Sequence, residues 1–267
     1  TLISDIAFRS FVVSRAGQIA VSMNHEVEQT ASIALINLRA AEPVPITIQT
    51  WQGVRAFPLA WSPDGARLQY IVEDGRGHYE LYVWENGTNT LLTHDFVPVF
   101  SGRFEASEDW SQDGSLIFST PDQSEQLRLQ VWNGETTTDI TPPDLPAAVE
   151  RYSASWSLGE QVAFVAIFGL RGRAIHTDLY LWDGETTHNL TEAPGEGDYD
   201  YFAPVWLADE RLMFAANTPH GTDVVTWTGG NGRNIETGLM ANVASLGWTA
   251  DGRAFFSATK TGEIFYQ

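Results

Sequence analysis

Tryptophan recurs along this chain at the spacing of a structural repeat. Nine of its ten Trp residues fall into two interleaved series. The first series is Trp61, Trp110, Trp156, Trp206 and Trp248, and the second is Trp84, Trp132, Trp182 and Trp227. Neighbouring members of a series are 42 to 50 residues apart, and each member of the first series follows an apolar run and precedes a turn. A period of this length indicates repeated supersecondary units.

Each repeat reads as four short strands joined by tight turns. In the best-preserved copy, strands are expected in the apolar run that ends at Trp61 and at residues 67–72, 80–84 and 90–93. Ser62-Pro63-Asp64-Gly65 supplies the first reversal, because Pro fixes φ at the second turn position and Gly accepts a positive φ. Asn86-Gly87 predicts a two-residue hairpin. No long window keeps the 3.6-residue apolar period of a helix, so the repeat is an antiparallel β-unit.

Six such repeats account for the chain. A degenerate first copy has Val13–Gly17 in the place of the Trp and its turn, and the copy that contains Trp248 has room for only three strands. Residues 2–8 have the length of the missing outer strand. We therefore predict an all-β fold, a six-bladed β-propeller of four-stranded antiparallel blades whose N-terminal strand completes the last blade. Residues 1–267 then form a single domain. A stack of β-sandwich modules fits less well, because the repeat is one blade long.

The turn motif also carries a family resemblance. The Trp61–Gly65 run, followed by Glu73–Tyr82 and closed by Leu92-Thr93, resembles the TolB-like propeller repeat, and weaker copies stand at Trp110–Gly114 and Trp248–Gly252. Proteins with such blades include a periplasmic scaffold that binds an envelope lipoprotein, propellers ahead of serine peptidase domains, and some polysaccharide lyases. The first and fourth repeats depart from the Trp-Ser-Pro-Asp-Gly pattern. The resemblance is therefore to the superfamily and is not a close match to TolB itself.

Composition excludes several functions. The chain has 15 basic and 34 acidic residues, a formal net charge of −19. Nucleic-acid binding rests on clustered Lys and Arg, so no nucleic-acid partner is expected. Cysteine is absent, which removes disulfides, thiolate metal sites and cysteine nucleophiles. No apolar run is long enough for a transmembrane segment. The motifs of serine hydrolases and P-loop enzymes are missing as well.

Propeller topology sorts the loops onto two faces. The loops between second and third strands share one face with the crossings between blades, and ligands are expected at this loop-rich channel mouth. Five of the six His residues map to this face, namely His25, His78, His94, His176 and His220. Without an HxH or HExxH spacing they predict no metal site. The candidate binding residues are Arg76, His78, Arg171, Arg173, His176, His220, Asp198 and Asp200. Outside both series, Trp51 is expected to make a surface contact.

The sequence leaves the function open among three classes. The first is a non-enzymatic interaction scaffold that binds a protein or peptide at the channel mouth, in the periplasm of a bacterium or outside the cell. The second is a polysaccharide lyase or hydrolase, or a carbohydrate-binding module, that uses the His and Arg residues of the same face. The third is a sensor or accessory propeller of a larger protein. No cofactor is predicted. Ca²⁺ in the channel is the one cation considered, because the acidic crossing 195–200 carries carboxylates.

Overall fold

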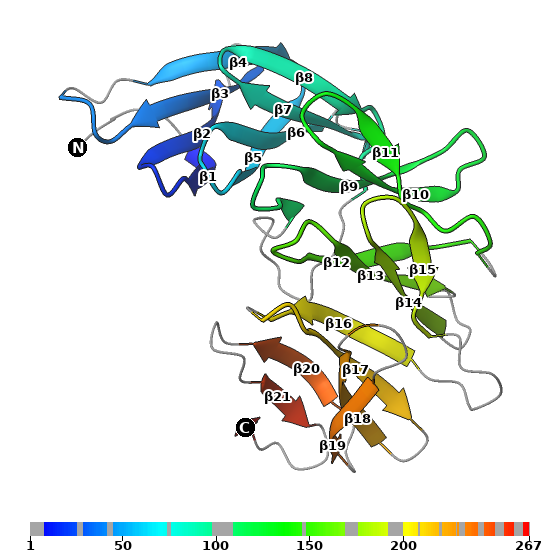
Figure 1. Ribbon diagram of the computed structural model, residues 1–267. Helices are drawn as coiled ribbons and strands as arrows, with labels where there is room; N and C mark the ends of the chain where they lie inside the picture. Colours follow the sequence, from blue (N-terminus) through cyan, green and yellow to red (C-terminus); the bar gives the residue numbers. More distant parts are fainter. Residues whose placement is uncertain are drawn as a thin grey trace.

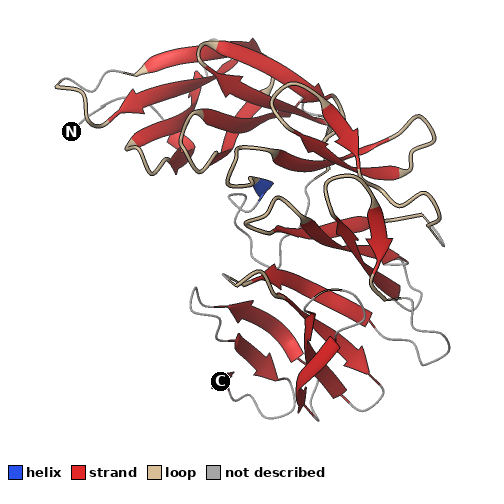
Figure 2. Cartoon of the chain, in the orientation of Figure 1, coloured by secondary structure: helices blue, strands red, loops and turns tan. Residues whose placement is uncertain are grey.

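The structure is built almost entirely of β-strands (Figures 1 and 2). The computed structural model describes residues 8–25, 29–41, 45–73, 76–97, 109–145, 148–168, 176–191, 200–207, 209–218, 221–227, 229, 233–239, 243–248, 254–258 and 264–266. No α-helix is present among these residues. The prediction of an all-β chain is confirmed.

The strands follow one another in successive antiparallel units, numbered here in chain order. Unit 1 holds β1 (Phe8–Val13), β2 (Gln18–His25), β3 (Thr30–Asn37) and β4 (Ile46–Gln52). Unit 2 holds β5 (Arg55–Trp61), β6 (Arg67–Glu73), β7 (Tyr79–Glu85) and β8 (Thr88–Thr93). Unit 3 holds β9 (Leu116–Pro121), β10 (Leu127–Trp132) and β11 (Thr137–Asp139). Unit 4 holds β12 (Arg151–Trp156), β13 (Val162–Phe168), β14 (His176–Trp182) and β15 (Thr187–Asn189). Unit 5 holds β16 (Asp200–Trp206), β17 (Leu212–Thr218), β18 (Gly221–Trp227) and β19 (Arg233–Leu239). Unit 6 holds β20 (Val243–Trp248), β21 (Ala254–Ala258) and β22 (Ile264–Tyr266).

The units form five sheets. Units 1, 2, 3 and 6 are separate sheets, whereas units 4 and 5 share one sheet through a single parallel pair, Thr177 with Asp200. Figure 1 shows the units along an arc, with unit 1 and β20–β21 on the same side of the view. Because two predicted blades share a sheet, and residues 1–7 lie outside the described part, the count of six and the N-terminal closing strand stay predictions.

Both Trp series occupy the predicted places. Trp61 ends β5 and Trp156 ends β12, while the second series lies at or near the end of the third strands. Within a unit, members of the two series pack edge to face: the ring centroids of Trp61 and Trp84 are 6.4 Å apart, and those of Trp156 and Trp182 are 6.5 Å apart. Such tilted pairs are favourable beyond the area that they bury. The Trp period therefore marks a repeated packing site.

The core lies between units. One cluster joins Ile33 of unit 1 to Trp61 and Tyr70 of unit 2, and another joins Leu129 of unit 3 to Phe164 of unit 4. These side chains stand on facing sheets, so each unit buries its apolar surface against its neighbours. First strands contact each other across these joints, β1 against β5 and β12 against β16. These first strands also contact later strands of the preceding unit, β5 against β2 and β3 and β16 against β13 and β14, so their innermost place stays a prediction.

Trp51 is partly buried against the core cluster of units 1 and 2, so the surface contact expected of it stays a prediction. Its ring lies 5.6 Å from that of Tyr70 and 6.5 Å from that of Tyr82, between units 1 and 2. Tyr70 and Tyr82 in turn stack at 5.2 Å with nearly parallel rings. Trp51 belongs to neither Trp series because it lies on the outer strand β4. There its ring packs between the sheets of units 1 and 2.

The first Trp series also links units through hydrogen bonds. The indole nitrogen Nε1 of Trp61 donates to the carbonyl oxygen of Val12 at 3.3 Å, and that of Trp156 donates to the carbonyl of Asp109 at 3.1 Å. Each acceptor stands one residue before the Trp position of the preceding unit. By contrast, the buried Nε1 atoms of Trp110 and Trp206 have no hydrogen-bond partner among the residues that the structure describes. The repeat thus contains two kinds of Trp site, bonded and unbonded.

This difference predicts unequal costs for one substitution. We expect Trp156→Phe to lower the free energy of unfolding by about 1 kcal/mol more than Trp110→Phe, because only the first leaves a buried carbonyl without its donor. Trp110 is buried whereas Trp156 is only partly buried, so Trp110→Phe removes at least as much buried apolar area and is a stringent control. Urea unfolding followed by circular dichroism measures the two values. Equal losses would show that the indole bond of Trp156 contributes nothing to stability.

Candidate functional site

The structure has the two faces that the topology predicts. Turns after the first strands and hairpins after the third strands lie on one side, called here the turn face. Loops between the second and third strands and the crossings between units lie on the other side, called the loop face. Each first strand runs from the loop face to the turn face, since its Trp end leads directly into a turn.

On the turn face, polar side chains mainly serve the fold. Asp64 accepts hydrogen bonds from the Ser62 hydroxyl at 2.6 Å and from the Ala66 amide at 3.0 Å, which closes the turn around Gly65 at φ +75°. The Ser62 bond, followed by the Ala66 bond, lowers the pKa of Asp64. Ser111 and Asp113 repeat the arrangement in unit 3. Both carboxylates thus accept hydrogen bonds that close their own turns.

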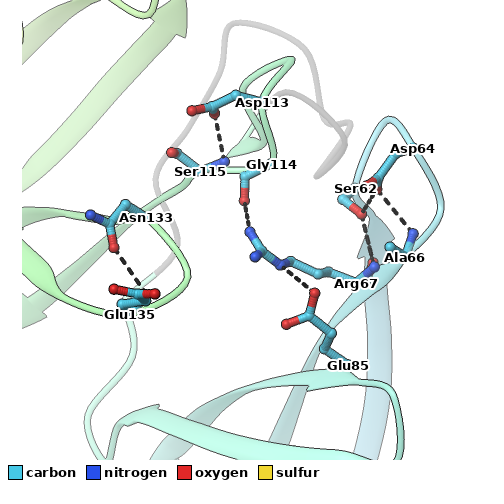
Figure 3. A network of polar contacts seen from close by, with 10 residues as sticks. All are labelled: Ser62, Asp64, Ala66, Arg67, Glu85, Asp113, Gly114, Ser115, Asn133 and Glu135. Carbon is cyan, nitrogen blue, oxygen red and sulfur yellow. Dashed lines mark hydrogen bonds and ion pairs between the residues drawn. The ribbon is translucent and has the colours of Figure 1, made fainter.

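Arg67 joins unit 2 to unit 3 on the same face (Figure 3). Its Nε lies 3.1 Å from Glu85 Oε1, and its Nη1 donates to the carbonyl of Gly114 at 2.7 Å. The guanidinium carbon lies 5.2 Å from the ring centroid of Trp132. Gly134 has φ +103°, and a Cβ there would stand 2.6 Å from Arg67 Nη2. The glycine therefore makes room for the arginine.

Glu160 replaces a turn glycine in unit 4. Its φ of 63° is the left-handed value that Gly65 has in unit 2, and few residues other than Gly adopt it. The side chain reaches back to the preceding turn, where it hydrogen-bonds with Asp113 and Ser111. Burial, followed by the hydrogen bond with Asp113, raises the pKa of Glu160 to about 7. Two carboxyl groups of neighbouring units thus share one proton near neutral pH.

The shared proton makes stability depend on pH. Because the folded-state pKa of Glu160 is raised to about 7 from an ordinary value of 4.5, the folded chain holds this proton more tightly than the unfolded chain. The resulting stabilisation is present at low pH and is lost as the pH rises toward 7. Glu160→Gln keeps the backbone and mimics the protonated acid.

We expect the stability of Glu160→Gln relative to the native chain to increase from pH 5 to pH 7.5. Urea unfolding across this range measures it, and Glu210→Gln is the control, since Glu210 has the same φ of 63°. A constant difference between native chain and Glu160→Gln would rule out the shared proton.

On the loop face, two polar contacts of histidines join the start of β7 and the loop before it to the crossing after β8 in unit 2. His78 Nδ1, in the loop before β7, lies 3.1 Å from Asp95 Oδ1, in the crossing after β8. His94 Nδ1, in the same crossing, lies 2.7 Å from Glu80 Oε1. The hydroxyl of Tyr82 donates to Glu80 Oε2 at 2.8 Å. Burial, followed by Glu80, raises the pKa of Tyr82 to about 12, so the phenol stays a donor. Both His side chains are exposed, and their pairs hold them in place.

Arg55 lies on this face as well. It is the first residue of β5, and its Nη1 is 3.6 Å from Glu73 Oε2 at the end of β6. The side chain of Arg55 is 62% exposed and that of Glu73 is 17% exposed. The sequence analysis missed Arg55, Glu80 and Asp95. Arg55 has a sequence signal, because it precedes Trp61 at the start of a predicted first strand.

The structure describes four of the eight predicted site residues. Arg76 and His78 lie in the loop of unit 2, where Arg76 is exposed. His176 begins β14 and Asp200 begins β16, and the pairing of Thr177 with Asp200 brings these two strand starts side by side. The other four lie outside the described residues: Arg171, Arg173, Asp198 and His220. The predicted site is therefore placed in part, on units 2, 4 and 5 of the loop face.

The described residues contain neither a cluster that could hold a metal ion nor a helix that could span a membrane. Within the described ranges, no three His, Asp or Glu side chains come together in a way that could hold a metal ion. The crossing considered for Ca²⁺ lies outside those ranges except for Asp200, so that expectation stays a prediction. No helix of the described chain is long and apolar enough to cross a membrane.

Known structures share this arrangement of units. The propeller domain of the Trilobed protease from Pyrococcus furiosus is 12% identical, with a TM-score of 0.52 over 97% of this chain and 81% of that one. Prolyl oligopeptidase B from Galerina marginata is 14% identical, with a TM-score of 0.61 over 98% of this chain and 42% of that one. The fold is a β-propeller.

Likeness to TolB is weaker. TolB from Acinetobacter baumannii is 16% identical, with a TM-score of 0.43 over 94% of this chain and 60% of that one. At this score the comparison shows no relation to TolB, and the TolB-like resemblance stays an expectation from the sequence. No family model and no curated protein sequence matches the chain. The propeller spans less than half the length of the Galerina peptidase.

Proposed function

We propose that this propeller is a non-enzymatic scaffold that binds a protein or peptide on its loop face. The observation that supports the proposal is the pair of contacts His78–Asp95 and His94–Glu80, which fix a loop and a crossing of unit 2 to each other. These contacts hold four polar side chains at the surface, and each side chain keeps part of its area exposed to solvent. A partner that binds to them meets groups already in position, which lowers the entropic cost of association.

The turn face offers a partner fewer polar groups. Arg67, Asp64 and Asp113 bond within or between turns, and the units depend on these bonds. A ligand that recruited them would weaken the joints between sheets. The contacts His78–Asp95 and His94–Glu80 do not hold units together, because each of them joins parts of unit 2. Binding and stability are therefore assigned to opposite faces of the propeller.

The resemblance to TolB-like repeats leads us to place the protein in the bacterial periplasm or outside the cell. Among the described residues, nothing favours the carbohydrate alternative.

An accessory role is a second candidate, because neighbours with TM-scores of 0.53 and 0.61 are peptidases of which this chain covers 39% and 42%. Measuring the mass of the mature polypeptide in its source cell tests it, and a mass of 29.5 kDa would count against an accessory role.

A peptide selection tests the scaffold role. Phage-displayed random peptides selected on the native propeller supply ligands, and their Kd values are measured on variants by biolayer interferometry. We expect the double variant His78→Ala, His94→Ala to weaken binding about tenfold, because anchor residues at an interface commonly contribute this much. His188→Ala is the matched control: His188 forms a similar exposed pair with Asp183, at 3.1 Å, beside the hairpin of unit 4.

The control separates the two faces. Loss of binding in His188→Ala but not in the double variant would move the site to the turn face and contradict the proposal. Peptides indifferent to both changes would contradict it as well. Thermal unfolding of each variant shows whether a loss reflects a folding defect.

A further inference from the structure

The hairpin of unit 2 carries a reactive pair of residues that the proposed function does not use. An asparagine side chain is most readily attacked by the main-chain nitrogen of the next residue when that residue is glycine, because glycine has no Cβ in the way and a permissive backbone. The chain contains three Asn-Gly pairs, which begin at Asn86, Asn133 and Asn231. Asn231 lies outside the described residues. The structure therefore allows the other two to be compared.

The pair Asn86-Gly87 forms an open hairpin tip on the turn face. It stands between the paired residues Glu85 and Thr88, with φ values of 48° and 85°. Asn86 is exposed, and its carboxamide has no hydrogen-bond partner among the described residues. A Cβ built on Gly87 would meet no described atom within 4 Å beyond its chain neighbours. The space beside the Gly87 nitrogen is therefore free for the side chain of Asn86 to turn into.

The pair Asn133-Gly134 has the same sequence but a fixed side chain (Figure 3). Oδ1 of Asn133 accepts hydrogen bonds from the amide of Glu135 at 3.0 Å and from that of Thr136 at 2.8 Å. The hydroxyl of Thr136 adds a third bond at 3.3 Å. A Cβ on Gly134 would stand 2.6 Å from Arg67 Nη2, so the guanidinium fills the space beside this glycine. Asn133 is exposed like Asn86, so freedom of the carboxamide is what distinguishes the two sites.

We propose that Asn86 is a site of spontaneous deamidation in the folded propeller, whereas the hydrogen bonds of Asn133 protect it. Hydroxide removes the amide proton of Gly87, and the nitrogen attacks Cγ of Asn86. The N–Cγ bond forms and the Cγ–Nδ2 bond breaks, and the leaving group takes a proton from water to depart as ammonia. Water then opens the cyclic imide at either carbonyl carbon. Opening at Cγ gives aspartate, and opening at the main-chain carbonyl gives isoaspartate.

The reaction changes the turn face beside a joint between units. Each conversion replaces a neutral amide with a carboxylate in a chain whose net charge is already −19. The adjacent Glu85 pairs with Arg67 at 3.1 Å, and Arg67 bonds to Gly114 of unit 3. Isoaspartate also lengthens the main chain by one carbon within a two-residue hairpin. The loop face lies on the other side, so its proposed function does not depend on this reaction.

Peptide mass spectrometry of aged protein tests the proposal. The native chain is kept in mildly alkaline buffer at body temperature, with and without concentrated urea, and is digested with trypsin at intervals. Asn86 falls in the peptide 77–103 and Asn133 in the peptide 129–151. In the folded protein we expect the first peptide to show the mass gain of NH2-to-OH exchange at least about tenfold faster, a factor that hydrogen bonds worth about 1.4 kcal/mol in total supply. In urea, where those bonds are broken, the two rates should become similar.

A variant confirms the assignment. Asn86→Gln keeps an amide but would need a larger ring, so it should abolish the mass gain of its peptide. Fragmentation of the peptide separates Asn86 from Asn89, which it also contains. Thermal unfolding shows that the variant is folded, and the comparison with urea needs no variant at all.

Three results would overturn the proposal. The first is equal rates at Asn86 and Asn133 in the folded protein, and the second is no conversion of Asn86. The third is a difference in rate that persists in urea, because flanking residues and not the folded structure would then protect Asn133.

Discussion

Each unit of this propeller depends on the one before it through the residue that ends its first strand. At Trp61 the indole ring fills the gap to unit 1, packs edge to face on Trp84, and donates to a carbonyl of the preceding first strand. A four-stranded sheet buries too little apolar area to be stable alone. Because this side chain packs between sheets, and at Trp61 and Trp156 also donates a hydrogen bond to the preceding unit, its repetition helps to join separate sheets into one structure.

The division between faces follows from this dependence. Joints need polar groups that satisfy buried carbonyls and close turns, and the turn face supplies them through Arg67, Asp64 and Asp113. Glu160 is a further example: it stands in a turn position that glycine takes in other units, and its carboxyl group hydrogen-bonds with the turn of the preceding unit. On the loop face, the backbone pair of Thr177 and Asp200 joins units 4 and 5, whereas the contacts His78–Asp95 and His94–Glu80 lie within unit 2.

Much of the fold could be predicted from the sequence because its signals are local and repeated. Two motifs each specify a backbone geometry within a few residues, the Ser62–Gly65 turn and the Asn86-Gly87 hairpin. The Trp spacing shows that the unit is repeated along the chain. Trp51 could not be predicted in the same way, since its burial depends on Tyr70 and Tyr82 of another unit. Closure of the ring is a relation between chain ends, and no local motif encodes it.

The site was predicted only as a face and as some of its residues. His78 and His94 were assigned to the correct side, but their carboxylate partners depend on how a crossing lies against a loop, which sequence spacing does not specify. Arg55 carried a usable signal in its distance from Trp61. Because Arg55 begins a strand, a prediction that assigns binding to loops leaves it out.

The pair of Thr177 and Asp200 gives units 4 and 5 a mechanical property of their own. Side chains packed between two sheets can slide by small steps, as in shear motions, whereas paired backbones move as one. Bending of the arc at that joint is therefore resisted on the loop face, next to the start of β14. A ligand that spans units 4 and 5 meets two anchor points at a constant separation.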